Sequence, residues 1–402
     1  MNTIDRRNWL KCAGAMALGV GLVARAEPEF ASADPGNVNV DADKLAKAVA
    51  FIDAEVKAGS MPGAALVGTR RGRKFVEHYI GTYRGFDGAD KPFDPTVASA
   101  LFSFSKGISA TVAVMAHQDG LIDYDVPVST YIPEFKGGGK ETISLRHLMT
   151  HSAGIPSIAG GSVLTDEQWA AFVKKVCDAS IEWPVGSKSA YHGVSGLFVV
   201  AEAVRRVSGM KSWNDICRER LFDPIGATSL AFGPFRDGIT RATTPGYFTS
   251  DENGLAGHPA GGCFGTVDDM LRVLNLIVQG GKWHGRTLIQ PEPLKEMLSV
   301  QYAGEIAKAV AEGKTPTHEP WGLGWLVRGP ATCPPNYWFG FGDSKSPTLF
   351  GHAGVDTVYG VGDPARELAF VFIITEKAKS AEEATRLRRE TSNLLQDAVT
   401  VA

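Results

Sequence analysis

A serine and a lysine that could form a nucleophilic pair stand at the start of an uncharged stretch. Ser103 and Lys106 are three residues apart, and no charged residue occurs from Gly107 to Ala116. Such a stretch predicts a helix buried on every side, with both side chains on one face and one turn apart if the helix begins near Ser103. A free lysine holds its proton to roughly pH 10, but burial and the positive end of a helix favour the neutral amine. A neutral amine can take the proton of a serine hydroxyl, so the pair predicts acyl transfer, whereas the alternative is a helix cap at Ser103 with Lys106 in water.

Two further chemical signals follow in chain order. Tyr191-His192-Gly193 directly precedes a predicted helix, so we expect the tyrosine hydroxyl in a loop. His352-Ala353-Gly354 lies at the end of a predicted strand, where a glycine lets a ligand approach the backbone. The order Ser-Lys, tyrosine, histidine along the chain is more informative than any of the three segments alone.

These segments resemble the three motifs of the serine β-lactamase and penicillin-binding-protein superfamily, in which S-x-x-K is followed by Y-x-N or a relative and then by K-T-G or H-x-G. The segment Leu145–Pro156 is similar to the superfamily sequence L-R-H-L-L-T-H-T-S-G-L-P. Further similarities lie in Leu121–Phe135, at Gly261-Gly262 and at Gly322-Leu323-Gly324-Trp325. The resemblance covers roughly residues 41 to 395.

The resemblance implies a Ser103 nucleophile that Lys106 and Tyr191 activate by passing protons, through an acyl-enzyme and without a metal or other cofactor. It also implies an oxyanion hole formed by the backbone N–H groups of Ser103 and Val355. The implied substrate-binding residues are His192, Gly193, His352 and Gly354. Each donor of an oxyanion hole contributes about 3 kcal/mol to the stabilisation of the transition state.

Two departures bear on the substrate. Gly193 stands where β-lactamases and peptidases commonly carry an asparagine, and His352 stands where they carry a lysine. Both changes resemble the carboxylesterases called family VIII, so we predict a carboxylesterase acting on short-chain or neutral esters. We expect His352 to be mostly neutral at pH 7 and to gain charge toward pH 6, since a free imidazole titrates near about 6.5. The alternatives are a β-lactamase or D-amino-acid peptidase, which act on a lactam or a short peptide, and a non-catalytic module that binds cell wall or a partner.

Other chemical interpretations are weaker. His147 and His151 have the spacing of a helical metal pair, but the glutamate of H-E-x-x-H is absent. The segment Thr150–Gly154 imitates a nucleophile elbow, yet it lacks the first glycine. We therefore predict structural roles for both histidines and no metal site.

The order of predicted elements is helix, strands, helical block, strands, helix. This order predicts an α+β fold with an antiparallel sheet flanked by the N- and C-terminal helices, and an inserted all-helical domain. The predicted α+β domain comprises residues 41–119 and 266–402, and the helical domain residues 120–265. The predicted helices include Asp41–Ala58, Val194–Val207, Val267–Val278, Ala381–Asp397 and two opened by caps at Thr165 and Ser212. The predicted strands are Ala64–Thr69, Lys74–Gly81, Gly322–Val327, Thr348–Gly351, Thr357–Val361 and Leu368–Thr375, the last apolar enough to be central.

The first 26 residues resemble a twin-arginine export signal. Arg6-Arg7 precedes a small apolar stretch, Ala13–Ala24, and Ala24-Arg25-Ala26 fits a cleavage site. We expect the mature chain to begin near Glu27, with a loose leader over residues 27–40, in the periplasm or outside the cell. No other apolar run reaches the length of a membrane span.

Composition excludes one class of partner. The 402 residues include 41 Lys and Arg and 44 Asp and Glu without a basic block, so we expect no nucleic-acid binding. The sequence leaves the oligomeric state open. The four cysteines after the predicted signal, Cys177, Cys217, Cys263 and Cys333, form no C-x-x-C pair, and free buried thiols are at least as plausible as disulfides.

Overall fold

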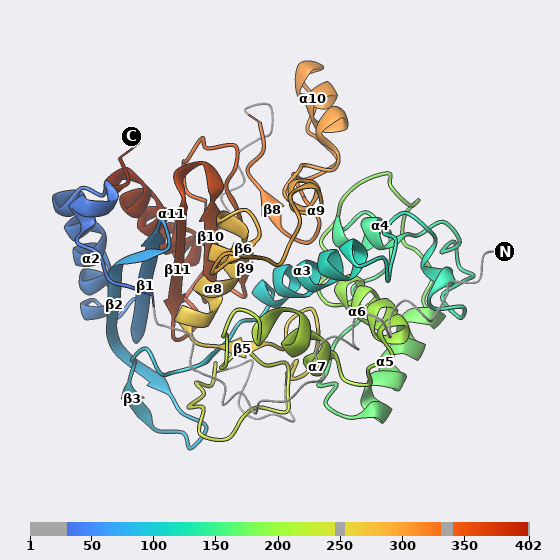
Figure 1. Ribbon diagram of the computed structural model, residues 1–402, viewed down its shortest axis with the longest axis horizontal. Helices are drawn as coiled ribbons and strands as arrows, with labels where there is room; N and C mark the ends of the chain where they lie inside the picture. Colours follow the sequence, from blue (N-terminus) through green and yellow to red (C-terminus); the bar gives the residue numbers. More distant parts are fainter. Residues whose placement is uncertain (1–29, 246–253, 331–340, 401–402) are drawn as a thin grey trace.

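The computed structural model describes residues 30–245, 254–330 and 341–400. A seven-stranded sheet in the order β3-β2-β1-β11-β10-β9-β8 forms its centre (Figure 1), and every pair of neighbouring strands is antiparallel. The strands come from both ends of the chain: β1 (Gly63–Arg70), β2 (Arg73–Arg84), β3 (Asp90–Pro92), β8 (Leu326–Val327), β9 (Phe350–Gly354), β10 (Val358–Asp363) and β11 (Leu368–Ile374). The predicted antiparallel sheet of an α+β fold is confirmed.

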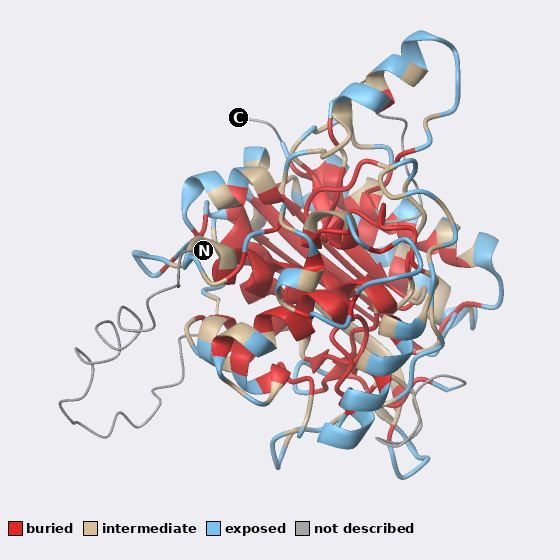
Figure 2. Ribbon diagram, turned by 90° about the vertical axis from the view of Figure 1, so that its right-hand side faces the viewer, coloured by how far each residue is buried: buried red, intermediate tan, exposed pale blue. Residues whose placement is uncertain are grey.

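Strand β11 lies in the middle of the sheet, as its apolar composition predicts. Its side chains alternate between two hydrophobic clusters: Val371 and Ile373 belong to one, Phe370 and Phe372 to the other. Helix α8 (Val267–Val278) covers the first face, and α2 (Ala42–Lys57) and α11 (Ala381–Ala398) cover the second (Figure 1). Figure 2 shows the buried sheet between helices whose outer faces are exposed. A strand covered on both faces is apolar at every position, which is why it reads as a continuous hydrophobic run.

The segment before α2 differs from the loose leader that the sequence predicts. In the described part, from residue 30, a 3-10 turn over Pro35–Val38 precedes Val40, and the valines at 38 and 40 are buried. The Ala33 N–H donates to the Lys74 carbonyl at 2.8 Å, which places the segment beside β2. The alanines and prolines of this segment form no helix or strand pattern in the sequence. Its order therefore depends on contacts with distant residues.

Two of the helices between the two groups of strands begin at the predicted caps. Thr165 accepts a hydrogen bond from the Gln168 N–H and Ser212 accepts one from the Asp215 N–H. The helices are α3 (Phe104–Gln118), α4 (Leu145–Met149), α5 (Asp166–Asp178), α6 (Ser195–Ser208) and α7 (Trp213–Cys217), with a π-helical turn over Arg218–Phe222 and a 3-10 turn over Val128–Thr130. Two short strands, β4 (Ser99–Ala100) and β5 (Phe264–Gly265), pair and bring the ends of this block together. The division into two domains at these borders stays a prediction.

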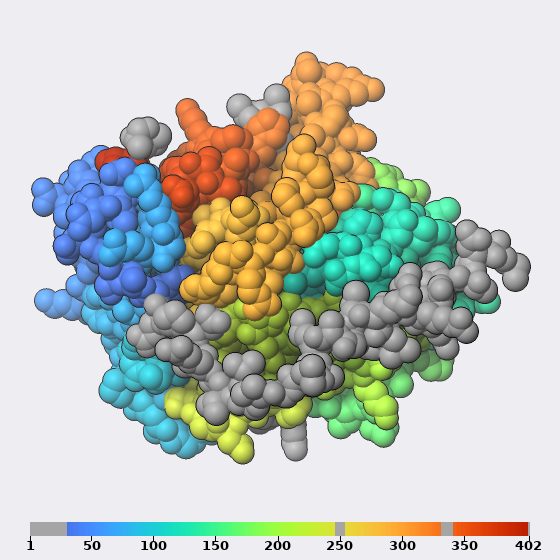
Figure 3. Space-filling model, in the orientation of Figure 1, coloured from blue at the N-terminus to red at the C-terminus, as the bar shows by residue number. Residues whose placement is uncertain are grey.

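The other elements that the structure describes lie between α8 and β11. They are β6 (Lys282–Trp283), β7 (Arg286–Thr287), α9 (Pro291–Met297), α10 (Ala303–Ala311) and a 3-10 turn over Pro364–Arg366. Helix α10 projects from the body of the molecule, as the space-filling view shows at the top (Figure 3).

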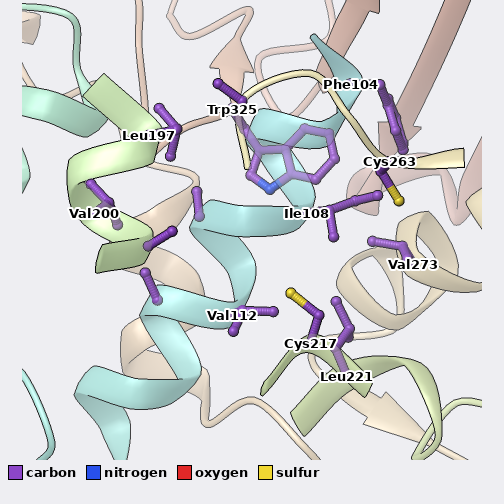
Figure 4. Packing of buried hydrophobic residues seen from close by; sticks show 14 of the residues in the cluster. Phe104, Ile108, Val112, Leu197, Val200, Cys217, Leu221, Cys263, Val273 and Trp325 are labelled. Atoms are coloured by element: carbon purple, nitrogen blue, oxygen red, sulfur yellow. The ribbon is translucent and has the colours of Figure 1, made fainter. Parts of the chain in front are cut away.

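The predicted strand Gly322–Val327 is mostly wrong, because only Leu326–Val327 pairs in the sheet. Gly324 has a φ of +74° in the left-handed region, and a Cβ there would lie 2.1 Å from the Cβ of Ala110. The segment therefore turns against α3 instead of extending. Trp325 packs beside α3 (Figure 4), and a Cβ on Gly107 would lie 2.4 Å from its ring. Two glycines thus let this segment and α3 approach closely.

Three cysteines of the described chain are free thiols: Cys177, Cys217 and Cys263. Cys333, the predicted export signal and residues 27–29 of the predicted leader lie outside the described residues. None of the helices described is both long and apolar enough to cross a membrane.

Candidate active site

Ser103 precedes the first residue of α3 and sits in an unusual backbone setting. Phe102, the residue before it, has a φ of +45°, in a region that costs a non-glycine residue about 1 to 3 kcal/mol. The Ser103 hydroxyl makes no capping bond to the helix, and Ser103 is partly exposed whereas Lys106 is buried. The alternative of a helix cap with Lys106 in water is therefore wrong.

Lys106 points at Ser103 from inside the protein. Its Nζ donates to the Ser103 Oγ at 3.0 Å and to the Ala260 carbonyl at 2.8 Å. The segment that carries the Ala260 carbonyl is fixed to α3 on both sides. Ser109 Oγ donates to the Pro259 carbonyl, and Ser105 Oγ accepts a hydrogen bond from the Cys263 N–H. Burial lowers the pKa of Lys106 from 10.5 to about 7. A substantial share of the amine is therefore neutral near neutral pH and can accept a proton.

Tyr191 completes the group. Its ring centroid lies 4.9 Å from the Lys106 Nζ, and the Ser103 side chain is near enough to act on the pKa of its hydroxyl. Burial raises the pKa of Tyr191 above its ordinary value, and the nearby Ser103 side chain opposes that rise. The structure thus brings Ser103, Lys106 and Tyr191 together. The serine and the lysine lie at the start of a helix, and the tyrosine lies in a loop 88 residues after Ser103. The neutral phenol can donate a proton or relay one.

The two predicted oxyanion donors lie on chain segments that touch. A Cβ on Gly354, at the end of β9, would lie 2.4 Å from the Leu101 carbonyl, which immediately precedes Phe102 and Ser103. Val355 has a φ of +42°, which is a genuine strain for a β-branched residue. Neither the Ser103 N–H nor the Val355 N–H donates to another residue within the described ranges. The Leu101 carbonyl thus leaves no room for a side chain at Gly354, and the substrate contact expected of this glycine stays a prediction.

His352 is uncharged for a reason that the sequence did not give. Burial, with the nearby Lys106, lowers the pKa of His352 to about 3. Its Nδ1 lies 2.7 Å from the Ala353 carbonyl, so Nδ1 carries the proton of a neutral ring. The expectation that His352 gains charge toward pH 6 is wrong, because its side chain is fully buried. The ring lies 6.1 Å from that of Tyr191.

His192 and Gly193 lie beside Tyr191 but face different neighbours. The His192 imidazole is buried, stacks on Trp183 at 5.9 Å, and has a pKa lowered to about 4 by burial. The Gly193 N–H donates to the Ser157 Oγ at 2.9 Å, and a Cβ on Gly193 would lie 2.6 Å from that oxygen. The space for a side chain at 193 is thus taken by the exposed hydroxyl of Ser157.

Sequence reasoning missed two residues that form one wall of the site. The Trp321 ring is stacked against that of Tyr191 at 6.0 Å and lies 5.8 Å from that of His352. The Trp321 Nε1 donates to Glu319 at 2.9 Å, and burial raises the pKa of Glu319. The only available signal was the neighbouring glycine-tryptophan motif at 322–325, which gave no sign that Trp321 would reach the tyrosine.

The two histidines of the possible metal pair serve different contacts. The His147 Nδ1 caps α4 through Ser144, whereas His151 lies after α4 beside Tyr191. Among the residues that the structure describes, no group of three or more His, Cys, Asp and Glu is placed to hold a metal ion.

The site places an amine, a phenol and two backbone donors around one accessible serine hydroxyl. The site and the fold together define the class of protein, a serine hydrolase of the β-lactamase and penicillin-binding-protein fold. The chain belongs to the Beta-lactamase family, whose sequence model matches residues 48–393. The predicted superfamily is thereby confirmed.

Similar proteins carry several activities in their names. Esterase/beta-lactamase LipL of Mycobacterium tuberculosis is 32% identical over 158 residues, which make up 37% of this chain and 35% of that protein. The chain therefore matches only about a third of that relative's length. A penicillin-binding-protein homolog from Caulobacter crescentus superposes with a TM-score of 0.70 at 22% identity, covering 89% of this chain and 99% of the other. A family VIII carboxylesterase does so with a TM-score of 0.67 at 20% identity, covering 89% and 98%. At these identities the two structures support the fold alone.

Proposed function

We propose that this protein is a carboxylesterase that hydrolyses short-chain, neutral esters through an acyl-enzyme on Ser103. The observation that carries the proposal is the neutral, buried His352 beside Tyr191, at the position where lysine would bring a permanent positive charge. Binding a substrate carboxylate favours a cationic partner, whereas an ester needs none.

Acylation begins with the neutral Lys106 amine. It takes the Ser103 proton as Oγ bonds to the ester carbonyl carbon, and the carbonyl oxygen becomes an anion held by the N–H groups of Ser103 and Val355. The C–O bond to the alcohol then breaks, and the departing oxygen takes a proton through Tyr191. In deacylation a water adds to the acyl carbon and loses one proton, relayed by Tyr191, to Lys106. The C–O bond to Ser103 then breaks, and Lys106 returns the proton to Oγ, which releases the acid and free Ser103.

Esters should be hydrolysed far better than β-lactams or peptides ending in a carboxylate. The uncharged His352 weakens the contact to the carboxylate and Gly193 offers no side-chain donor, which together cost about 2 to 4 kcal/mol, or roughly thirtyfold to one thousandfold in kcat/KM. The measurement compares p-nitrophenyl butyrate, nitrocefin and a D-alanyl peptide at pH 7.5. Since the pKa of His352 is about 3, the ratio should stay constant between pH 6 and 8.

Nitrocefin turnover that equals or exceeds ester turnover would instead favour the β-lactamase alternative, and a fast D-alanyl peptide would favour a peptidase. The non-catalytic alternative has its own test. A fluorophosphonate probe should label Ser103 in the folded protein, as mass spectrometry of the labelled peptide can determine, and an unlabelled serine would favour a binding module.

Tyr191→Phe should lower kcat by about a hundredfold while KM changes little, because the substitution removes a proton donor and almost no volume. Initial rates over a range of p-nitrophenyl butyrate concentrations separate the two constants. Tyr302→Phe is the matched control, since that hydroxyl bonds Ser152 and lies outside the proposed chemistry. A raised KM with an unchanged kcat would assign Tyr191 to binding alone.

We also propose that the chain is exported through its twin-arginine-like segment and acts in the periplasm or outside the cell. Arg6→Lys with Arg7→Lys should keep the protein in the cytoplasm, as cell fractionation can measure. The exported wild-type chain should begin near Glu27 by N-terminal sequencing, and an intact Met1 on the periplasmic protein would contradict the predicted cleavage.

A further inference from the structure

His151 is strained and fully buried, although no step of the proposed mechanism uses it. It follows α4 with a φ of +55°, in the left-handed region that non-glycine residues rarely adopt. Such a conformation costs about 1 to 3 kcal/mol and persists where surrounding contacts require it. Those contacts converge on Tyr191.

The backbone on both sides of Tyr191 is bonded to this one residue. The Ala190 N–H donates to the His151 carbonyl at 2.9 Å, and the His192 N–H donates to the His151 Nδ1 at 3.1 Å. The imidazole also packs on the tyrosine ring, with centroids 4.7 Å apart, and on Trp321 at 4.5 Å. His151 therefore contacts the backbone before Tyr191, the backbone after it and its ring.

The hydrogen bonding also sets the chemical state of the imidazole. Because Nδ1 accepts a hydrogen bond from the His192 backbone N–H, the ring must carry its own proton on Nε2 and be neutral. Burial, with His192 and Lys106 nearby, lowers the pKa of His151 well below its usual value, so this state persists over the working pH range. A proton on Nδ1 would point its N–H at the His192 N–H, and the hydrogen bond that holds the loop would be lost.

We infer that His151 is a positioning residue for Tyr191. By accepting a hydrogen bond from the His192 N–H, His151 holds the phenol hydroxyl toward Ser103. The inference rests on the proposed role of Tyr191 and extends it to a residue that touches neither the substrate nor the nucleophile. The neighbouring bond from the Gly186 N–H to the Ser152 carbonyl also supports this loop, so a purely structural role must be distinguished by experiment.

Two polar substitutions separate the acceptor from the rest of the side chain. His151→Asn keeps an oxygen near the position of Nδ1 and tolerates a left-handed backbone. His151→Gln extends its amide toward the position of Nε2 and leaves the His192 N–H without its partner. We expect kcat for p-nitrophenyl butyrate to be about tenfold higher in the asparagine variant than in the glutamine variant, with similar KM, because small misplacements of a catalytic group are costly.

A second background tests whether the effect passes through the tyrosine. In Tyr191→Phe chains the two variants should have equal kcat, since the hydroxyl that His151 positions is gone. Two results would overturn the inference: a tenfold difference between the variants that persists in Tyr191→Phe chains, or equal kcat of the two variants in chains that keep Tyr191. His147→Asn is the control, because that histidine caps α4 without touching Tyr191, and its kcat should match wild type.

Circular dichroism and thermal unfolding first establish that each variant is folded. Should His151→Gln not fold, His151→Gly replaces it, since glycine adopts this backbone without strain and lacks the acceptor. If wild type hydrolyses no ester, the proposed function fails, and a crystal structure then decides the inference separately. The loop at residues 190–192 should be displaced in the glutamine variant and retained in the asparagine variant, and an unmoved loop in both would overturn it.

Discussion

Ser103→Ala is expected to lower kcat/KM for p-nitrophenyl butyrate by about a thousandfold or more while the protein stays folded. The hydroxyl is the proposed nucleophile, and the groups around it act as a unit, so removing one member loses nearly the whole effect. Stability should change little, because Ser103 is partly exposed and its hydroxyl does not cap α3. Initial rates with thermal unfolding of the same preparation make the measurement.

Ser105→Ala supplies the matched control two positions along the same helix. The Ser105 Oγ is buried and accepts the Cys263 N–H at 3.1 Å, so its loss leaves a buried donor without a partner and destabilises by about 1 to 3 kcal/mol. We therefore expect a lower unfolding temperature with kcat/KM within a few-fold of wild type. Wild-type turnover in Ser103→Ala would end the assignment of this serine.

Features that depend on neighbours in sequence were predictable. A serine and a lysine three residues apart on a helix must share a face, and the uncharged run after them predicted the burial of Lys106. Caps at Thr165 and Ser212 predicted helix starts, since their side chains bond backbone N–H groups only three residues on.

Features that depend on distant residues were not. The pKa of His352 is set by burial among residues that no spacing connects to it, such as Trp321 and Tyr191. The turn at Gly322–Trp325 exists because α3 approaches it, and a strand pattern cannot show that approach. For the same reason His151 could be excluded from a metal pair on sequence, yet its contacts around Tyr191 appear only when the loop is folded onto it.

Lys106→Met is expected to lower kcat/KM by about a thousandfold or more, since it removes the proposed proton acceptor and keeps an unbranched side chain of similar length. Lys106→Arg should be equally inactive, because a guanidinium does not lose its proton in proteins. The two variants should differ in stability, since arginine buries a permanent charge where the lysine pKa is about 7. Turnover near the wild-type level in either variant would show that another group accepts the Ser103 proton.

The methionine variant also isolates the energetic effect of the buried amine on stability. Between about pH 7 and 10.5 the unfolded chain binds a proton at Lys106 that the folded chain has released, so the free energy of unfolding of wild type rises with pH in this window. Below about pH 7 both states carry the proton, and the rise ends. Lys106→Met has no such contribution, while every other titrating group is shared.

Urea unfolding of both proteins at pH 7.5 and 9.5 should show wild type gaining roughly 2 kcal/mol in the free energy of unfolding relative to the variant. An equal pH dependence in the two proteins would mean that the folded-state pKa of Lys106 is not lowered, and the proposed neutral amine would then be lost with it.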